Sequence, residues 1–196
     1  MMYIDLHTHH APESQDVVAV VDGRDTWGIH PWKADADFVV PDLSEKMAIG
    51  ECGLDAVRGA SMGRQEDVFM RQVALGEELK KPLVIHCVKA FDRLLRLRRE
   101  LRPAMPWMLH GFRGKPQQLR SLLDAGFFVS FGFRHNEESL RLCPLERLML
   151  ETDDDKRHIS ILYNNVAAAR GISVAILCDE MAKNYRAFFR KEPLLA

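Results

Sequence analysis

Two histidines near the start of the chain have the spacing of a metal-binding pair. His7 and His9 follow the mostly apolar residues 1–6. Residues two apart on a strand point to the same side, so both imidazoles can reach one metal ion. A pair of hydrogen-bonded surface histidines would show the same spacing. His10 alternates to the other side and is not expected to be a ligand, while Asp5 is expected to support the site without binding metal.

Four more ionisable residues stand where later apolar runs end. Glu51 lies between glycines in Gly50-Glu51-Cys52-Gly53, a costly place for a carboxylate unless a cation compensates it. His86 and His110 each follow three apolar residues. Taken singly, each would fit a satisfied core histidine. Asp153 follows Leu150-Glu151-Thr152. The acidic stretch around it would also fit a solvated loop without a metal.

Together these residues offer nitrogen and oxygen ligands for two divalent ions, with Glu51 able to bridge them. Two metals about 3.5–4 Å apart can activate water and stabilise both oxygens of a displacement, so hydrolysis is the expected reaction. Asp153 is suited to accept a proton from the attacking water, and Glu51 and Asp153 are the expected catalytic residues. The predicted metal ligands are His7, His9, Glu51, His86, His110 and Asp153.

The elements that must position these residues alternate along the chain. Apolar runs end at residues 7, 30, 51, 86, 110, 130 and 153, and helical periodicity covers 65–80, 91–101, 116–125, 137–142, 159–170 and 174–189. This alternation predicts an α/β fold with parallel strands. Ionisable residues at nearly every strand end favour a TIM-type (β/α) barrel over an open doubly wound sheet, which gathers its ligands at one switch point.

The barrel is expected to be incomplete or distorted near the N-terminus. Only about twenty residues separate His10 from His30, too few for the usual crossover helices between parallel strands. Residues 17–21 form a further apolar run, and the turn-like Asp22-Gly23-Arg24-Asp25 follows it. We expect this strand to form a hairpin with the strand ending at His30.

Length, composition and charge indicate what kind of protein this is. The 196 residues are 47% hydrophobic, enough for a single domain over residues 1–196 with a sizeable core. A net charge of −1 argues against a broad basic surface for nucleic acid. The four cysteines include no C-x-x-C pair and are expected to be reduced and buried. The sequence shows neither a secretory signal nor a long apolar span, so a cytoplasmic protein without membrane contact or an obligate protein partner is expected.

The ordered motifs resemble the TatD-like metal-dependent hydrolases of the amidohydrolase superfamily. They read Asp5-Leu6-His7-Thr8-His9, Gly28-Ile29-His30-Pro31, Ala48-Ile49-Gly50-Glu51-Cys52-Gly53-Leu54-Asp55, Pro82-Leu83-Val84-Ile85-His86-Cys87, His110-Gly111-Phe112-Arg113-Gly114 and Leu150-Glu151-Thr152-Asp153. The resemblance implies one metal held by His7, His9, Glu51 and Asp153 and a second held by Glu51, His86 and His110. It also implies deoxyribonuclease activity, with a phosphodiester substrate such as DNA. Relatives often use magnesium, but this ligand set also suits zinc, manganese or iron.

Three residues are expected to bind substrate. His30 follows a strand and can donate to the substrate, although a structural role fits it nearly as well. Arg113 replaces the family's small hydroxyl residue and can clamp a phosphate, or it is a surface arginine. Lys89 stands near the family's usual arginine position after His86. Asp154 and Asp155 add negative charge that opposes a polyanion.

Two other functions stay open. An amidohydrolase-like or PHP-type enzyme acting on a small lactone, amide or phosphoester would share the opening H-x-H. A metal-binding relative that has lost turnover would share the ligands and the shortened N-terminal segment. The motifs around His30 and Glu51 favour the TatD-like reading over the PHP type.

Overall fold

The strands run in one direction and follow one another around the molecule in chain order. The computed structural model describes residues 1–35 and 37–193. Its strands are β1 (Tyr3–Thr8), β2 (Val17–Val21), β3 (Thr26–Trp27), β4 (Ala48–Asp55), β5 (Leu83–Val88), β6 (Trp107–Leu109), β7 (Phe128–Phe131) and β8 (Leu148–Leu150). Strands β3 to β8 form a six-stranded sheet in sequence order, β1 and β2 pair separately, and every pairing is parallel.

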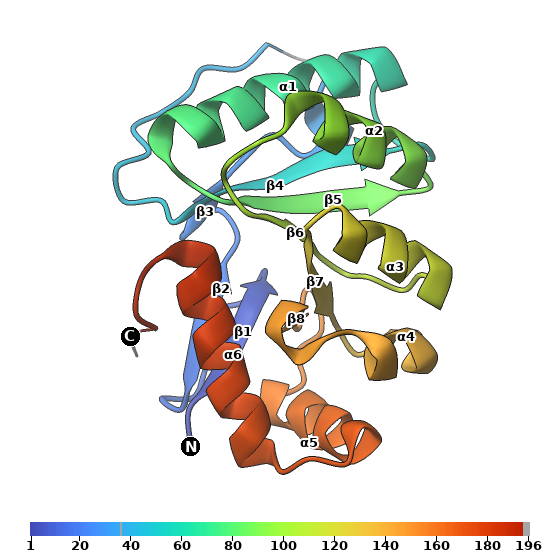
Figure 1. Cartoon of the computed structure of the whole chain (residues 1–196). Coiled ribbons are helices and arrows are strands. Elements are labelled where there is room, and N and C mark those ends of the chain that lie inside the picture. The colour runs from blue at the N-terminus through green and yellow to red at the C-terminus, as the bar shows by residue number, and fades with distance from the viewer. Residues whose placement is uncertain (36, 194–196) are drawn as a thin grey trace.

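The two sheets meet at one edge and remain apart at the other. Thr8 and Asp153 form a parallel bridge, with His9 N–H donating to Asp153 O (3.1 Å) and Asp153 N–H donating to His7 O (3.0 Å). Within residues 1–35 and 37–193 no ladder joins β2 to β3. The expected TIM-type α/β architecture, incomplete near the N-terminus, is therefore confirmed (Figure 1).

The hairpin expected for residues 17–21 is wrong. Strand β2 pairs in parallel with β1, Tyr3 opposite Val17 and Ile4 opposite Val18, and the connection between them contains no helix. Both faces of β2 are largely buried, which suits a strand inside a parallel arrangement better than a hairpin arm. The strand expected to reach His30 ends at Trp27, because Pro31 begins the short 3₁₀ helix η1 (Pro31–Lys33), with His30 as its N-cap.

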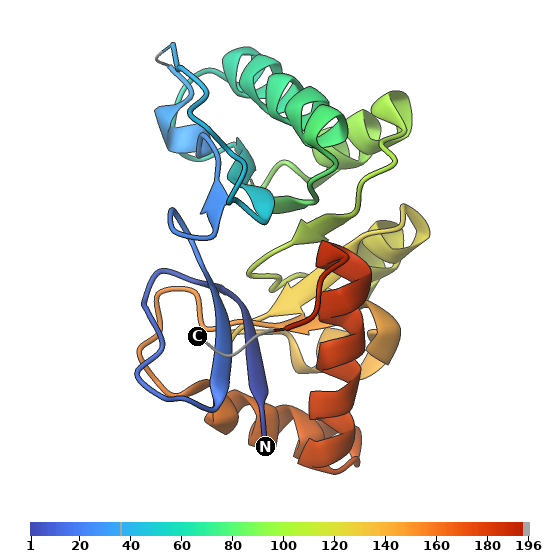
Figure 2. The same ribbon diagram turned by 90° about the vertical axis from the view of Figure 1, so that its left-hand side faces the viewer.

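The helices pack on the outside of the strands. They are α1 (Met62–Leu79), α2 (Phe91–Leu101), α3 (Pro116–Asp124), α4 (Glu137–Leu142), α5 (Ile159–Arg170) and α6 (Val174–Phe189), and a second 3₁₀ turn, η2 (Leu145–Arg147), precedes β8. Figures 1 and 2 show α1 and α2 over β4 and β5, and α5 and α6 beside β1 at the opposite end of the molecule. All six helices fall where the sequence predicted them, with small shifts at the ends of α1 and α3.

Buried aromatic side chains tie the helices to the strands. Phe69 of α1 packs its ring against Trp107 of β6, and both side chains are fully buried. The hydroxyl of Tyr163 in α5 donates to Ile4 O (2.9 Å) and accepts from Ile4 N–H (3.0 Å). Helix α5 thereby pairs backbone groups of β1 that β2 leaves unpaired, which fixes the strand that carries His7 and leads into His9.

Within the described residues, no single helix has the length and apolar composition needed to cross a bilayer. Helices α5 and α6 reach that length and composition only as a pair bent by 108°.

Candidate metal centre

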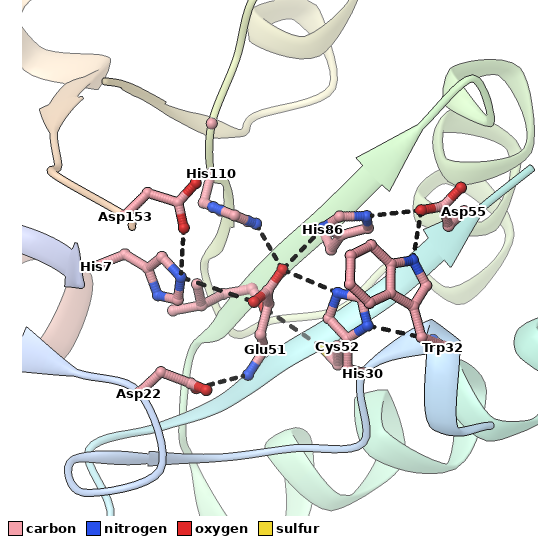
Figure 3. A network of polar contacts seen from close by, with 12 residues as sticks. His7, Asp22, His30, Trp32, Glu51, Cys52, Asp55, His86, His110 and Asp153 are labelled. Carbon is pink, nitrogen blue, oxygen red and sulfur yellow. Dashed lines mark hydrogen bonds and ion pairs between the residues drawn. The ribbon is translucent and has the colours of Figure 1, made fainter. Parts of the chain in front are cut away.

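Glu51 lies at the middle of a ring of imidazoles (Figure 3). Its Oε1 is 2.8 Å from His86 Nδ1 and 2.8 Å from His110 Nε2. His30 Nε2 is 3.2 Å from the same oxygen. The strands that carry these groups approach closely, because a Cβ at Gly53 would lie 2.0 Å from His86 O. Glycine at this position, at φ +138°, lets β4 and β5 bring Glu51 and His86 together.

The other carboxylate oxygen of Glu51 faces His7 in β1 and His9 just after this strand. His7 Nε2 and His9 Nε2 each lie 3.8 Å from Glu51 Oε2. Asp153 Oδ1 completes this half of the cluster, 3.8 Å from His7 Nε2 and 3.4 Å from His9 Nε2. The structure thus brings all six predicted metal ligands to one place at the carboxyl ends of the strands. Their individual roles as ligands stay a prediction.

The donor set fits divalent cations. Four groups of three side chains place their ligand atoms within 4.8 Å of one another: His7, His9 and Asp153; His7, Glu51 and His110; His30, Glu51 and His86; and His110, Glu151 and Asp153. Ligands bound about 2.0–2.2 Å from one ion stand roughly 3–3.6 Å apart, close to the separations seen here. Both ring nitrogens of His7 are buried without a hydrogen-bond partner, and a bound cation would satisfy one of them.

The charges of the cluster depend on one another. Burial raises the pKa of Glu51, but His110, His30 and His86 outweigh it and hold that pKa far below its ordinary value. Burial lowers the pKa of His110, yet Glu51 and Glu151 outweigh it and hold the pKa well above the ordinary range. Glu51 and His110 therefore form a buried ion pair in the metal-free protein.

His7 in β1 and His9 just after it differ in their ionisation. Asp153 raises the pKa of His9 to about 9, against a smaller effect of burial. Burial, and then the positive charge of His110, lowers the pKa of the fully buried His7. His7 is thus a neutral imidazole, in which one ring nitrogen carries the proton and the other has a lone pair available to a metal.

Three carboxylates that the sequence reasoning missed contact the far nitrogens of the histidines. Asp55 Oδ2 is 3.2 Å from His86 Nε2, Glu151 Oε1 is 3.3 Å from His110 Nδ1, and Asp22 Oδ2 is 3.8 Å from His9 Nδ1. A carboxylate on the second nitrogen is the usual outer support of a metal-binding histidine. Each of the three follows or ends an apolar strand, the same signal that identified the predicted ligands.

Asp5 supports the site as expected. Its buried carboxylate accepts from Thr152 N–H (2.9 Å) and from the Thr152 hydroxyl (2.6 Å), and burial raises its pKa to about 7. It joins β1 to the segment that carries Asp153. His10 is exposed and lies 3.3 Å from Asp154 O through Nε2, so it stays outside the cluster.

The three residues expected to bind substrate lie in different places. His30 belongs to the Glu51 cluster itself. Arg113 is exposed and lines a depression beside the cluster together with Gly132, Arg134 and Asp153. Lys89 is exposed in a separate depression formed with Ala56, Phe91 and Arg93. None of these positions contradicts substrate contact, which stays a prediction for all three.

The sequence model of the family described as TatD related DNase matches residues 6–190. The chain belongs to the TatD-related DNase family. A Pantoea ananatis protein named 3'-5' ssDNA/RNA exonuclease TatD is 32% identical over 199 residues, covering 84% of this chain and 76% of that protein. A Klebsiella pneumoniae protein of the same name is 37% identical over 146 residues, 65% of this chain and 56% of its own length. This TatD-related chain therefore aligns with only part of each relative.

Two further similarities bear on the class and the fold. The Escherichia coli protein named uncharacterized metal-dependent hydrolase YcfH is 34% identical over 180 residues, 80% of this chain and 68% of that protein. The crystal structure of YjjV, a TatD homologue from Escherichia coli, superposes with a TM-score of 0.75 at 19% identity, covering 91% of this chain and 79% of YjjV. The TatD-like family, its fold and the metal-dependent hydrolase class expected from the motifs are confirmed.

Proposed function

We propose that this TatD-related chain is a divalent-metal-dependent nuclease that cleaves phosphodiester bonds and removes nucleotides from the 3' end of single-stranded DNA or RNA. The proposal rests on two groups of potential metal ligands that share Glu51. One contains His7 and His110, and the other contains His30 and His86. The names of the Pantoea ananatis and Klebsiella pneumoniae relatives support the choice of substrate and direction.

In this proposal the cluster holds two ions. His7, His9 and Asp153 with Glu51 would hold one, and Glu51 with His86 and His110 would hold the other, with His30 next to the second group. Magnesium, zinc, manganese and iron all suit this mixture of imidazole and carboxylate. When bound, such ions supply the Lewis acidity that activates water and stabilises charge on phosphoryl oxygens.

Asp153 is the residue placed to move the proton. Burial raises the pKa of Asp153, but His9 and His110 outweigh it and lower that pKa, so the carboxylate is ionised at neutral pH. Its side chain keeps 28% of its surface exposed, whereas Glu51 keeps 8%. Asp153 can therefore meet an attacking water and accept its proton, while Glu51 stays enclosed by imidazoles.

Basic and imidazole groups are available to hold the substrate. Arg113 faces the depression that Asp153 lines and can donate two parallel hydrogen bonds to a phosphate. His30 can donate to a phosphoryl oxygen from the other side of Glu51. Lys89 is exposed farther along the rim and would meet a phosphate only in a longer strand.

A small phosphoester is the second candidate substrate, favoured by the acidic residues beside the cluster. Asp154 and Asp155 line the same depression as Arg113, and the whole chain carries a net charge of −1. These charges oppose a long polyanion more than a short one.

The test is a substrate panel with magnesium, manganese and zinc. It would contain a 5'-labelled single-stranded oligonucleotide, its duplex, bis(p-nitrophenyl) phosphate, p-nitrophenyl phosphate and a lactone. We expect a ladder of products shortened from the 3' end of the single strand, absent in Asp153→Asn. Hydrolysis of the small esters alone would favour the second candidate, and hydrolysis of the lactone alone would contradict both.

A further inference from the structure

Trp32 is a partly exposed aromatic residue held against the Glu51 cluster (Figure 3). The residue keeps 42% of its surface exposed. Its indole N–H donates to Asp55 Oδ2 (2.7 Å), and its backbone N–H donates to His30 Nδ1 (3.2 Å). The indole centroid is 4.5 Å from the His30 ring and 5.9 Å from the His86 ring. The ring is thus fixed in orientation beside the site, and the proposed chemistry gives it no task.

A cation lies over this indole. The Arg58 guanidinium carbon is 3.9 Å from the Trp32 ring centroid. The loop that carries Arg58 is itself anchored, because Asp55 Oδ1 accepts from Val57 N–H (2.8 Å) and Arg58 N–H (3.1 Å). A Cβ at Gly59 would lie 2.5 Å from Pro31 O, so this loop packs directly on the 3₁₀ turn that carries the indole.

One carboxylate connects this pair to the cluster. Asp55 holds the indole, the Arg58 loop and His86 Nε2, 3.2 Å away, and the same His86 contacts Glu51 through Nδ1. The flat ring and the guanidinium therefore have a fixed position relative to the place where a phosphate would react. The pair combines a π surface with a positive charge next to an otherwise carboxylate-rich centre.

We propose that Trp32 and Arg58 form a stacking site for the nucleobase of a nucleotide whose phosphate lies at the Glu51 cluster. This inference rests on the proposed nuclease function and adds how the substrate is recognised. Nucleobases stack on tryptophan and on arginine planes with little dependence on sequence. A base inside a duplex has both faces covered by its neighbours, so the site selects single strands or frayed ends.

The binding test compares a nucleotide with its base-free counterpart. Affinities for dAMP and for deoxyribose 5-phosphate would be measured calorimetrically with Mg²⁺ present. Stacking is worth about 1–3 kcal/mol per base, so wild type should bind dAMP about 5- to 150-fold more tightly. Trp32→Leu should abolish that difference and leave deoxyribose 5-phosphate binding unchanged within about twofold.

Two further variants separate stacking from support of the neighbouring residues. Trp32→Phe keeps a ring but loses the hydrogen bond to Asp55, and it should retain most of the preference for dAMP. Arg58→Gln should weaken that preference and leave the ring in place. Thermal unfolding of each variant would show that it is folded. Equal loss of affinity for both ligands in Trp32→Leu would overturn the inference, because the indole would then only position His30 and Asp55.

The outcomes for the two proposals differ. Equal binding of dAMP and deoxyribose 5-phosphate by a wild type that cleaves oligonucleotides would overturn the stacking site and leave the nuclease. A clear preference for dAMP in a protein that cleaves no phosphodiester with any metal would overturn the nuclease and support the base site.

Discussion

Replacing Glu151 by glutamine should weaken metal binding without altering any predicted ligand. The Glu151 carboxylate is fully buried at the end of β8. Its Oε1 accepts from Gly111 N–H (2.7 Å) and lies 3.3 Å from His110 Nδ1. This contact keeps the Nδ1 proton on the side of Glu151, so the proton that a metal must displace is the one on Nε2, 2.8 Å from Glu51.

The size of the effect follows from the lost charge. A hydrogen bond to a charged group is worth about 1.5–3 kcal/mol, against about 0.5–1.5 kcal/mol between neutral groups. Glutamine keeps the shape and an acceptor but removes the charge, so about 1–2 kcal/mol of support for His110 is lost. That corresponds to a roughly 5- to 30-fold weaker metal affinity, which overlaps the about 10- to 100-fold loss usual for outer-sphere partners.

The assay is calorimetric titration of the metal-free protein with Mn²⁺ or Zn²⁺. Glu146→Gln makes the same chemical change at an exposed residue of η2 and should bind metal as wild type does. A folded Glu151→Gln protein whose metal affinity matched that of wild type within twofold would refute the positioning role of Glu151.

Three other predictions concern stability, pH and the barrel. Asp5→Ala leaves the buried Thr152 N–H without its acceptor, while the Thr152 hydroxyl keeps Thr8 Oγ1 (3.0 Å), so thermal or urea unfolding should show a loss of about 1–3 kcal/mol, with Asp5→Asn losing less. Because the pKa of His9 is about 9, the metal-free protein holds a proton there at neutral pH, and metal binding should release protons and strengthen as the pH rises toward 9. Titration in buffers of different ionisation enthalpy measures that release, and a metal affinity unchanged between pH 6 and 8 would contradict it. Gly53→Ala should destabilise the fold and weaken metal binding together, because the added Cβ would meet His86 O.

The position of the ligands was predictable because the parallel strands end at one rim. Glu51, His86 and His110 each follow a short apolar run, and parallel strands bring such residues together whatever the details of their connections. Asp22, Asp55 and Glu151 also follow or end apolar runs, but this signal does not distinguish a carboxylate that supports a histidine from a metal ligand or a loop residue. Their roles emerge only when the far nitrogens of the histidines are located.

The pairing of β2 could not be derived from sequence. The short stretch from His10 to His30 leaves little room for crossover helices, and the turn-like Asp22-Gly23-Arg24-Asp25 favours a hairpin between residues 17–21 and the strand ending at His30. Burial of β2 on both faces, and the donation of Tyr3 N–H to Asp16 O (2.8 Å), decide the outcome. His30 likewise joins the cluster through the 3₁₀ turn at Pro31, a local geometry that apolar periodicity does not reveal.

The most direct test of the central claim is the number of metal ions bound per chain. Metal analysis after equilibrium dialysis against Mn²⁺ or Zn²⁺ would compare wild type with Glu51→Gln and with the surface control Glu146→Gln. The shared position of Glu51 predicts two ions in wild type and in the control, and loss of both or a large fall in the affinity for both in Glu51→Gln. Wild-type metal content in a folded Glu51→Gln protein would contradict the account.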